Sequence, residues 1–140
     1  MSMLVKASIE RRLIDLATKN DPVSKAKHSA GLVLKGRLIA TGTNKRKTHP
    51  IMAKYGRNSE AVYLHAELDC ITKALREYGP EVVAASDLYV ARVLKSGDWS
   101  NSCPCEGCRR AINAFRIQKV YYTTQRGWEV FIPDWRSSVV

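Results

Sequence analysis

The chain contains no apolar run that approaches the roughly 20 residues of a membrane-spanning helix. Its first residues, MSMLVKASIERRLIDL, are interrupted by charge from Lys6 onward and so lack the apolar core of a secretory signal. We therefore expect a cytoplasmic protein with no membrane partner. Internal repeats and low-complexity tracts are also missing, and 140 residues suit a single domain over residues 1–140.

Cysteine is scarce, and its placement argues against a disulfide scaffold. Of the four cysteines, Cys103, Cys105 and Cys108 lie within six residues of one another, and Cys70 lies inside an expected helix. A disulfide framework would spread its cysteines along the chain and belongs to oxidising compartments. Clustered cysteines in a reducing compartment more often bind a metal. Cys70 we interpret as a small buried apolar side chain.

Acidic residues are few compared with basic ones. The chain has 23 Lys and Arg against 13 Asp and Glu, a formal net charge of +10. This charge bears on partners and not on fold, and it makes nucleotides or nucleic acids the obvious anionic candidates. Residues 44–57, NKRKTHPIMAKYGR, contain no acid at all. We interpret them as a loop, either a solvated surface loop or a rim that attracts phosphate.

Hydrophobic periodicity predicts alternating helices and strands. The expected elements are a helix over 3–19, a hairpin turning at Lys35-Gly36, a helix over about 61–78, a strand over 87–94, a helix over 105–115, and strands over 119–123 and 128–132. The strand over 87–94 is almost continuously apolar, which is typical of a strand covered on both faces. This order of elements predicts a three-layer α/β domain.

The helix expected over 61–78 carries a carboxylate on its apolar side. Glu67 precedes Ile71, Ala74 and Tyr78 by four, seven and eleven residues, so it should point inward with them, whereas Asp69 should face solvent. An inward carboxylate requires a partner, a metal or a function, because burying it alone is costly.

The segment PCEGC, residues 104–108, places two cysteines at the expected start of a helix. Proline suits a first helical turn, and the free N–H groups there favour thiolates. Alone, such a pair could be a metal site, a redox dithiol or a chance occurrence. His65 lies near the start of the other helix, and two helix N-termini brought together would offer one nitrogen and two sulfurs. Zinc accepts these ligands, and three of them leave a fourth position for water, as in catalytic sites.

With HAE at residues 65–67 and PCEGC at 104–108, the chain resembles the cytidine deaminase superfamily, particularly its deoxycytidylate deaminase branch. The resemblance extends over roughly residues 27–123 and implies an αβα fold with a central mixed sheet of about five strands. It implies one catalytic Zn²⁺ held by His65, Cys105 and Cys108. Glu67 would shuttle the proton while a zinc-bound hydroxide attacks the ring carbon that bears the amino group.

The resemblance also implies a substrate and its contacts. The leading expectation is hydrolytic deamination of a cytosine nucleotide or nucleoside, best represented by dCMP to dUMP and ammonia. Asn44, just after the second strand of the hairpin, matches a substrate-binding asparagine of the family, and the Ala66 backbone N–H would help to fix the base. Lys45 and Lys47 could bind one phosphate. Relatives usually assemble as dimers or larger, so a homo-oligomer is expected.

Two other function classes stay open at the sequence level. The charge of +10 exceeds what one phosphate requires, which favours a polynucleotide deaminase acting on tRNA adenosine or on single-stranded cytosine. Trp99 could stack on a base or simply pack its loop. A zinc-stabilised binding module without catalysis is disfavoured by the intact Glu67. Cys103 is an extra thiol next to Pro104, and we interpret it as a small loop residue or a ligand in place of Cys105.

Overall fold

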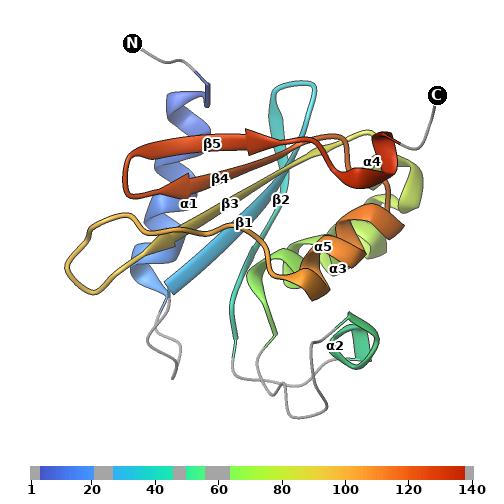
Figure 1. Cartoon of the computed structure of the whole chain (residues 1–140), viewed down its shortest axis with the longest axis horizontal. Coiled ribbons are helices and arrows are strands. Elements are labelled where there is room, and N and C mark those ends of the chain that lie inside the picture. The colour runs from blue at the N-terminus through green and yellow to red at the C-terminus, as the bar shows by residue number, and fades with distance from the viewer. Residues whose placement is uncertain (1–3, 21–26, 46–49, 56–63, 138–140) are drawn as a thin grey trace.

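A five-stranded mixed sheet runs through the centre of the computed structural model (Figure 1), which describes residues 4–20, 27–45, 50–55 and 64–137. The strands are β1 (Lys27–Leu34), β2 (Arg37–Thr43), β3 (Asp87–Val93), β4 (Val120–Thr124) and β5 (Gly127–Phe131). Their order is β2-β1-β3-β4-β5, with β3 and β4 parallel and the other neighbours antiparallel. The expected sheet of about five mixed strands is confirmed.

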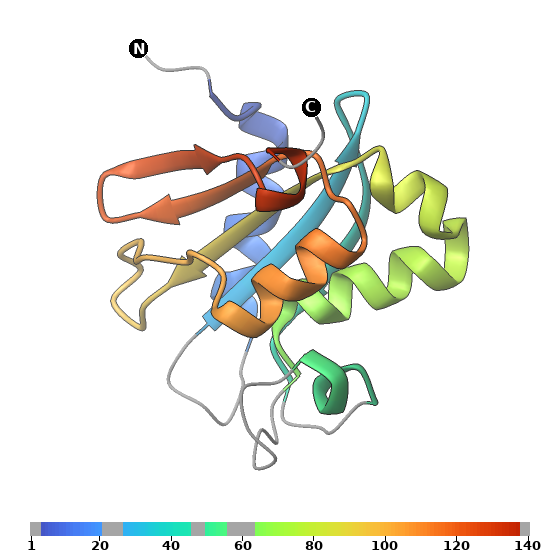
Figure 2. The same ribbon diagram turned by 45° about the vertical axis from the view of Figure 1, so that its right-hand side comes forward.

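Helices cover both faces of this sheet, which confirms the three-layer α/β prediction (Figure 2). Helix α1 (Ala7–Lys19) lies on one face, while α3 (Ala66–Tyr78), α4 (Pro80–Ala84) and α5 (Glu106–Ala114) lie on the other. Successive residues of a strand point to opposite faces. Accordingly Tyr89 and Ala91 pack in the cluster formed with α1, whereas Leu88 and Val90 pack in the cluster formed with α3 and α5.

The hairpin between β1 and β2 turns where the sequence predicted. Lys35 and Gly36 both have positive φ, 51° and 79°, which is the backbone conformation of a type I′ turn. This turn lies at the end of the sheet opposite to Thr43, Asn44 and the start of β1. The register that pairs Ser29 with Thr43 brings that second end of β2 beside β1.

The acid-free segment is not wholly a loop. Residues Pro50–Tyr55 form the short helix α2, so the loop prediction was wrong there. The Tyr55 ring lies 6.1 Å from that of Phe115, and the Tyr55 carbonyl accepts a hydrogen bond from Arg110 Nη2 at 3.2 Å. Six residues are too few for a stable isolated helix, so packing against α5 stabilises this one.

Helix α3 begins later than the sequence suggested. Ala66 is its first residue, and Leu64 instead forms an antiparallel bridge with Lys45. Residues 61–63, where the helix was expected to start, lie outside the described ranges. A short 3-10 helix, η1 (Asp134–Arg136), packs on α5. No helix in the described ranges is both long and apolar enough to cross a bilayer.

Candidate metal centre

His65 is held at the N-terminus of α3 by the chain on either side of it. It is the N-cap residue, in an extended conformation with φ −69° and ψ 148°. Immediately before it, Leu64 and Lys45 exchange two backbone hydrogen bonds of 2.8 and 2.9 Å. This bridge fixes the direction in which the chain enters the helix, and therefore the position from which the His65 ring projects.

Close contact between β2 and α3 fixes the height of that helix over the sheet. A Cβ atom at Gly42 would lie 2.5 Å from the Cys70 backbone nitrogen and 2.6 Å from the Ala66 carbonyl oxygen. Both are backbone atoms, which cannot move aside as a flexible side chain can. Only glycine therefore permits this approach, and Gly42 sets the distance between the sheet and the first turn of α3.

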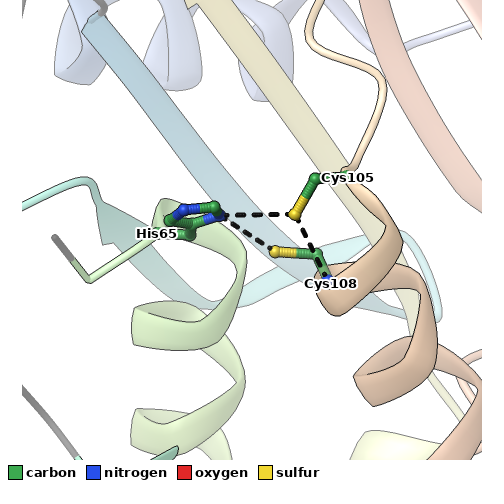
Figure 3. A group of neighbouring side chains, drawn as sticks. All are labelled: His65, Cys105 and Cys108. Carbon is green, nitrogen blue, oxygen red and sulfur yellow. Dashed lines mark hydrogen bonds between the residues drawn. The ribbon is translucent and has the colours of Figure 1, made fainter. Parts of the chain in front are cut away.

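The two cysteines come from the start of α5. Cys105 is the N-cap residue, and its Sγ accepts the backbone N–H of Cys108 at 3.5 Å. Cys108 lies in the first turn and is buried. The predicted meeting of two helix N-termini is therefore what the structure shows (Figure 3).

His65, Cys105 and Cys108 present one nitrogen and two sulfurs to a common point. The His65 Nδ1 atom lies 3.3 Å from Cys108 Sγ and 3.6 Å from Cys105 Sγ, and all three atoms lie within 4.8 Å of one another. A tetrahedral zinc ion with ordinary Zn–N and Zn–S bond lengths separates such atoms by about 3.5 Å. The donor set and its spacing therefore fit zinc.

The surroundings of Cys105 favour its thiolate. Hydrogen bonds from the Cys108 thiol, from His65 and from the Cys108 backbone amide lower the pKa of Cys105 to about 3. The hydrogen bond with Cys105, together with burial, raises the pKa of the Cys108 thiol. Zinc binds the thiolate form of cysteine, so any proton that either sulfur still carries is released when the ion binds.

Glu67 lies beside these three residues with its side chain turned inward, as the helical spacing predicted. It is only 6% exposed, and burial raises the pKa of its carboxyl group. Its side chain is hydrogen-bonded with Cys108. A buried carboxyl group next to a metal-binding triad can give up or accept a proton without competition from bulk water.

The family model for the cytidine and deoxycytidylate deaminase zinc-binding region matches residues 6–124 of this chain. The chain belongs to the cytidine and deoxycytidylate deaminase family. The matched region is the zinc-binding region of the family, so the expected zinc cofactor is confirmed, and His65, Cys105 and Cys108 within it form a possible site for the ion.

Three solved structures share the fold of this chain. The dCMP deaminase of cyanophage S-TIM5 in its apo form has a TM-score of 0.58 and 21% identity, covering 86% of each chain. The same enzyme in complex with dCMP and dUMP has a TM-score of 0.55 and 21% sequence identity, and the match covers 84% of this chain and 82% of that one. Acinetobacter baumannii RibD has a TM-score of 0.51 and 18% sequence identity, and the match covers 84% of this chain and 27% of that longer one. No curated protein matches the deaminase sequence.

The structure describes four of the five residues that the sequence predicted to contact the substrate, namely Asn44, Lys45, Ala66 and Trp99. Asn44 is buried at the end of β2, where its Oδ1 accepts hydrogen bonds from the His28 backbone N–H at 2.9 Å and from Asn20 Nδ2 at 2.7 Å. Ala66 is fully buried as the first residue of α3. Lys47 lies outside the described residues.

Lys45 is engaged within the protein. Its ammonium group pairs with Asp69, which is 6% exposed and also accepts hydrogen bonds from the Thr43 backbone N–H and from Lys73 Nζ, both at 3.1 Å. The prediction that Asp69 faces solvent was wrong. The first turn of α3 packs against the end of β2, so the side that a helical projection marks as outer is covered there.

Trp99 is not brought to the triad. Its ring packs edge-on against Trp128 at 5.9 Å and, with Ala7, Glu10 and Ile14 of α1, lines a hollow on the opposite face of the sheet. Trp99 therefore packs against Trp128 of β5, on the side of the sheet that carries α1.

Cys103 is also outside the triad. Its Sγ accepts a hydrogen bond from Arg109 Nη2 at 3.1 Å, and its sulfur is not among the three ligand atoms that lie together. Two side chains that the sequence reasoning did not assign to the site are His28 on β1 and Arg92 on β3, which are paired in register, and the charges of Arg92 and His65 both act on His28. Alternation along β3 could have revealed Arg92, because it shares a face with Leu88 and Val90.

Proposed function

We propose that this deaminase is a zinc-dependent hydrolase acting on a cytosine nucleotide or nucleoside, with dCMP as substrate and dUMP and ammonia as products. The observation that carries the proposal is the buried Glu67 carboxyl group beside His65, Cys105 and Cys108. A structural zinc site would have no use for such a carboxyl group, because burying it without a function is costly.

In this proposal each residue has one role. His65, Cys105 and Cys108 hold the ion, which when bound acidifies water and neutralises developing negative charge. The Glu67 carboxylate takes the proton that water loses on adding to the amino-bearing ring carbon. It passes this proton to the adjacent ring nitrogen, then takes the proton of the added hydroxyl group and delivers it to the amino nitrogen, so that the C–N bond breaks, the carbonyl forms and ammonia leaves. The Ala66 N–H and the Asn44 side chain position the base and sugar.

The choice of dCMP rests on relatives and on charge. The S-TIM5 enzyme, which shares the fold, was solved with dCMP and dUMP, so this pair is the first to test. The net charge of +10 favours an anionic substrate. We also propose that residues 1–140 form one deaminase domain that assembles into a homo-oligomer. All described strands belong to one sheet.

The decisive experiment compares Glu67→Gln with wild type in an ammonia-release assay on dCMP, CMP, dCTP and deoxycytidine. The variant should keep its zinc, measured by elemental analysis, and lose activity by roughly 10²- to 10⁴-fold. Glu77→Gln is the matched control, because Glu77 is an exposed acid on the same helix. Unchanged ammonia release by the Glu67 variant would overturn the proposed role.

The second candidate is a polynucleotide deaminase, which the excess of basic charge favours. It is tested in the same assay by adding tRNA and single-stranded DNA and by following the mass shift of the base. Turnover of a polynucleotide but of no mononucleotide would replace the first proposal.

A further inference from the structure

Arg92 lies near the end of β3 on the face of the sheet that carries the zinc triad. Leu88 and Val90 of the same strand pack against α3 and α5, and Arg92 is the next residue to point to that side. Across the sheet it is paired in register with His28 of β1. The alternation thus directs a half-buried guanidinium group toward the same side as His65.

His28 links Arg92 to the triad. Burial, followed by the nearby charges of Arg92 and His65, lowers the pKa of His28 to about 4. Both side chains therefore lie close enough to His28 for their charges to act on it. The Asn44 side chain completes this neighbourhood, because its Oδ1 accepts the His28 backbone N–H. Arg92 thus lies beside the region where the proposed substrate would bind.

The side-chain donors of Arg92 find few acceptors among the residues that the structure describes. Its Nε atom is buried and has no hydrogen-bond partner in the part of the chain that the structure describes. Its Nη1 atom donates a long hydrogen bond, 3.5 Å, to the Asn101 carbonyl. No carboxylate within the described ranges forms an ion pair with it. A buried arginine N–H without an acceptor costs free energy of folding. A bound ligand with an acceptor oxygen would recover this cost.

Neighbouring arginines show what a satisfied guanidinium looks like in this protein. Arg109 donates to the Pro104 carbonyl and to Cys103 Sγ and lies 4.4 Å over the Phe131 ring. Arg110 donates to the Tyr55 carbonyl and forms an ion pair with Glu106. Arg92 differs from both because its buried Nε atom has no partner among the residues that the structure describes.

We infer that Arg92 binds the phosphate monoester of a nucleotide whose base lies at the zinc triad. A guanidinium fork matches two phosphate oxygens, and it binds them more strongly than neutral donors do. The inference rests on the proposed function, which places a nucleotide there. It also supplies a phosphate contact that does not depend on Lys45, whose ammonium group is paired with Asp69.

The test is a comparison of product binding in wild type, Arg92→Gln and Arg92→Lys, using calorimetry with dUMP and with deoxyuridine. Wild type should bind dUMP more tightly than deoxyuridine. Arg92→Gln should weaken the binding of dUMP by about 10- to 100-fold and the binding of deoxyuridine by less than about threefold. The affinity of Arg92→Lys for dUMP should lie between those of wild type and Arg92→Gln. Arg37→Gln is the matched control, because it removes the same charge from an exposed position at the far end of the sheet.

The outcomes separate this inference from the proposed function. Equal losses for dUMP and deoxyuridine would overturn the phosphate contact, as would a variant that weakens only a single-stranded oligonucleotide. Deamination of dCMP that is indifferent to Arg92→Gln would leave the function standing and remove Arg92 from it. Arg92-dependent binding of dUMP without deamination of any cytosine compound would support the contact while the proposed function failed.

Discussion

Replacing Asp69 with asparagine should destabilise the protein by about 2 kcal/mol at neutral pH. The Asp69 side chain is 8% exposed, while its partners Lys45 and Lys73 are 36% and 49% exposed. Hydrogen bonds to a charged group contribute about 1.5–3 kcal/mol, and asparagine keeps an acceptor for the Thr43 N–H. Because both lysines can turn to water when the charge is lost, the cost lies near the lower end of that range.

The pH dependence gives this prediction its sign. Burial acts to raise the pKa of Asp69, but the hydrogen bonds from Lys45, the Thr43 amide and Lys73 outweigh it and lower the pKa. The stabilisation is therefore fully present above the unfolded pKa of about 3.9 and disappears as the pH falls through the lower folded pKa. The difference between wild type and variant should stay constant from pH 7 to pH 5, and shrink at pH values below about 4.

Urea unfolding of both proteins, at one fixed zinc concentration, measures this difference. Asp15→Asn is the control, since it breaks an exposed pair with Lys19 on α1 and should cost no more than about 0.5 kcal/mol. The reasoning is refuted if the two substitutions cost the same at pH 7, or if the cost of Asp69→Asn grows as the pH falls.

Two further predictions concern the metal and the packing under it. Cys105→Ala should lose most of its zinc by elemental analysis while Cys103→Ala keeps it, because the Cys103 sulfur lies outside the triad; zinc loss from Cys103→Ala alone would reverse that assignment. Gly42→Ala should cost about 2–3 kcal/mol in urea unfolding, since the new methyl group meets backbone atoms of α3. Gly31→Ala should cost less, because its methyl group meets the movable Leu38 side chain, and an equal cost at both sites would contradict the argument.

The triad could be predicted because its three residues belong to two short sequence patterns, HAE and PCEGC. His65, Cys105 and Cys108 stand at helix starts that proline and periodicity mark in the sequence. The inward direction of Glu67 follows from helical spacing alone. We expected the two helix ends to meet because a metal ion needs several ligands. The distances from His65 Nδ1 to Cys108 Sγ and Cys105 Sγ, 3.3 and 3.6 Å, agree with this.

What the sequence could not provide depends on packing between distant segments. Asp69 looked solvent-facing because a helical projection ignores the strand against which a first turn packs, and its partner Lys45 lies 24 residues away. Helix α2 is too short to show a helical pattern in the sequence, and its contacts with α5 exist only in the folded chain. Arg92 was not singled out because it lies in the almost continuously apolar segment 87–94. Its neighbours Ala91 and Val93 point to the opposite face of the sheet.

The placement of the aromatic residues has a consequence for spectroscopy. All three tryptophans are remote from the triad: Trp99 and Trp128 pack together on the α1 side of the sheet, and the Trp135 indole donates to the Ile117 carbonyl beyond the end of α5. Intrinsic fluorescence therefore reports the integrity of the α1 side and of the C-terminal segment. It provides a signal for unfolding that is largely separate from occupancy of the catalytic side.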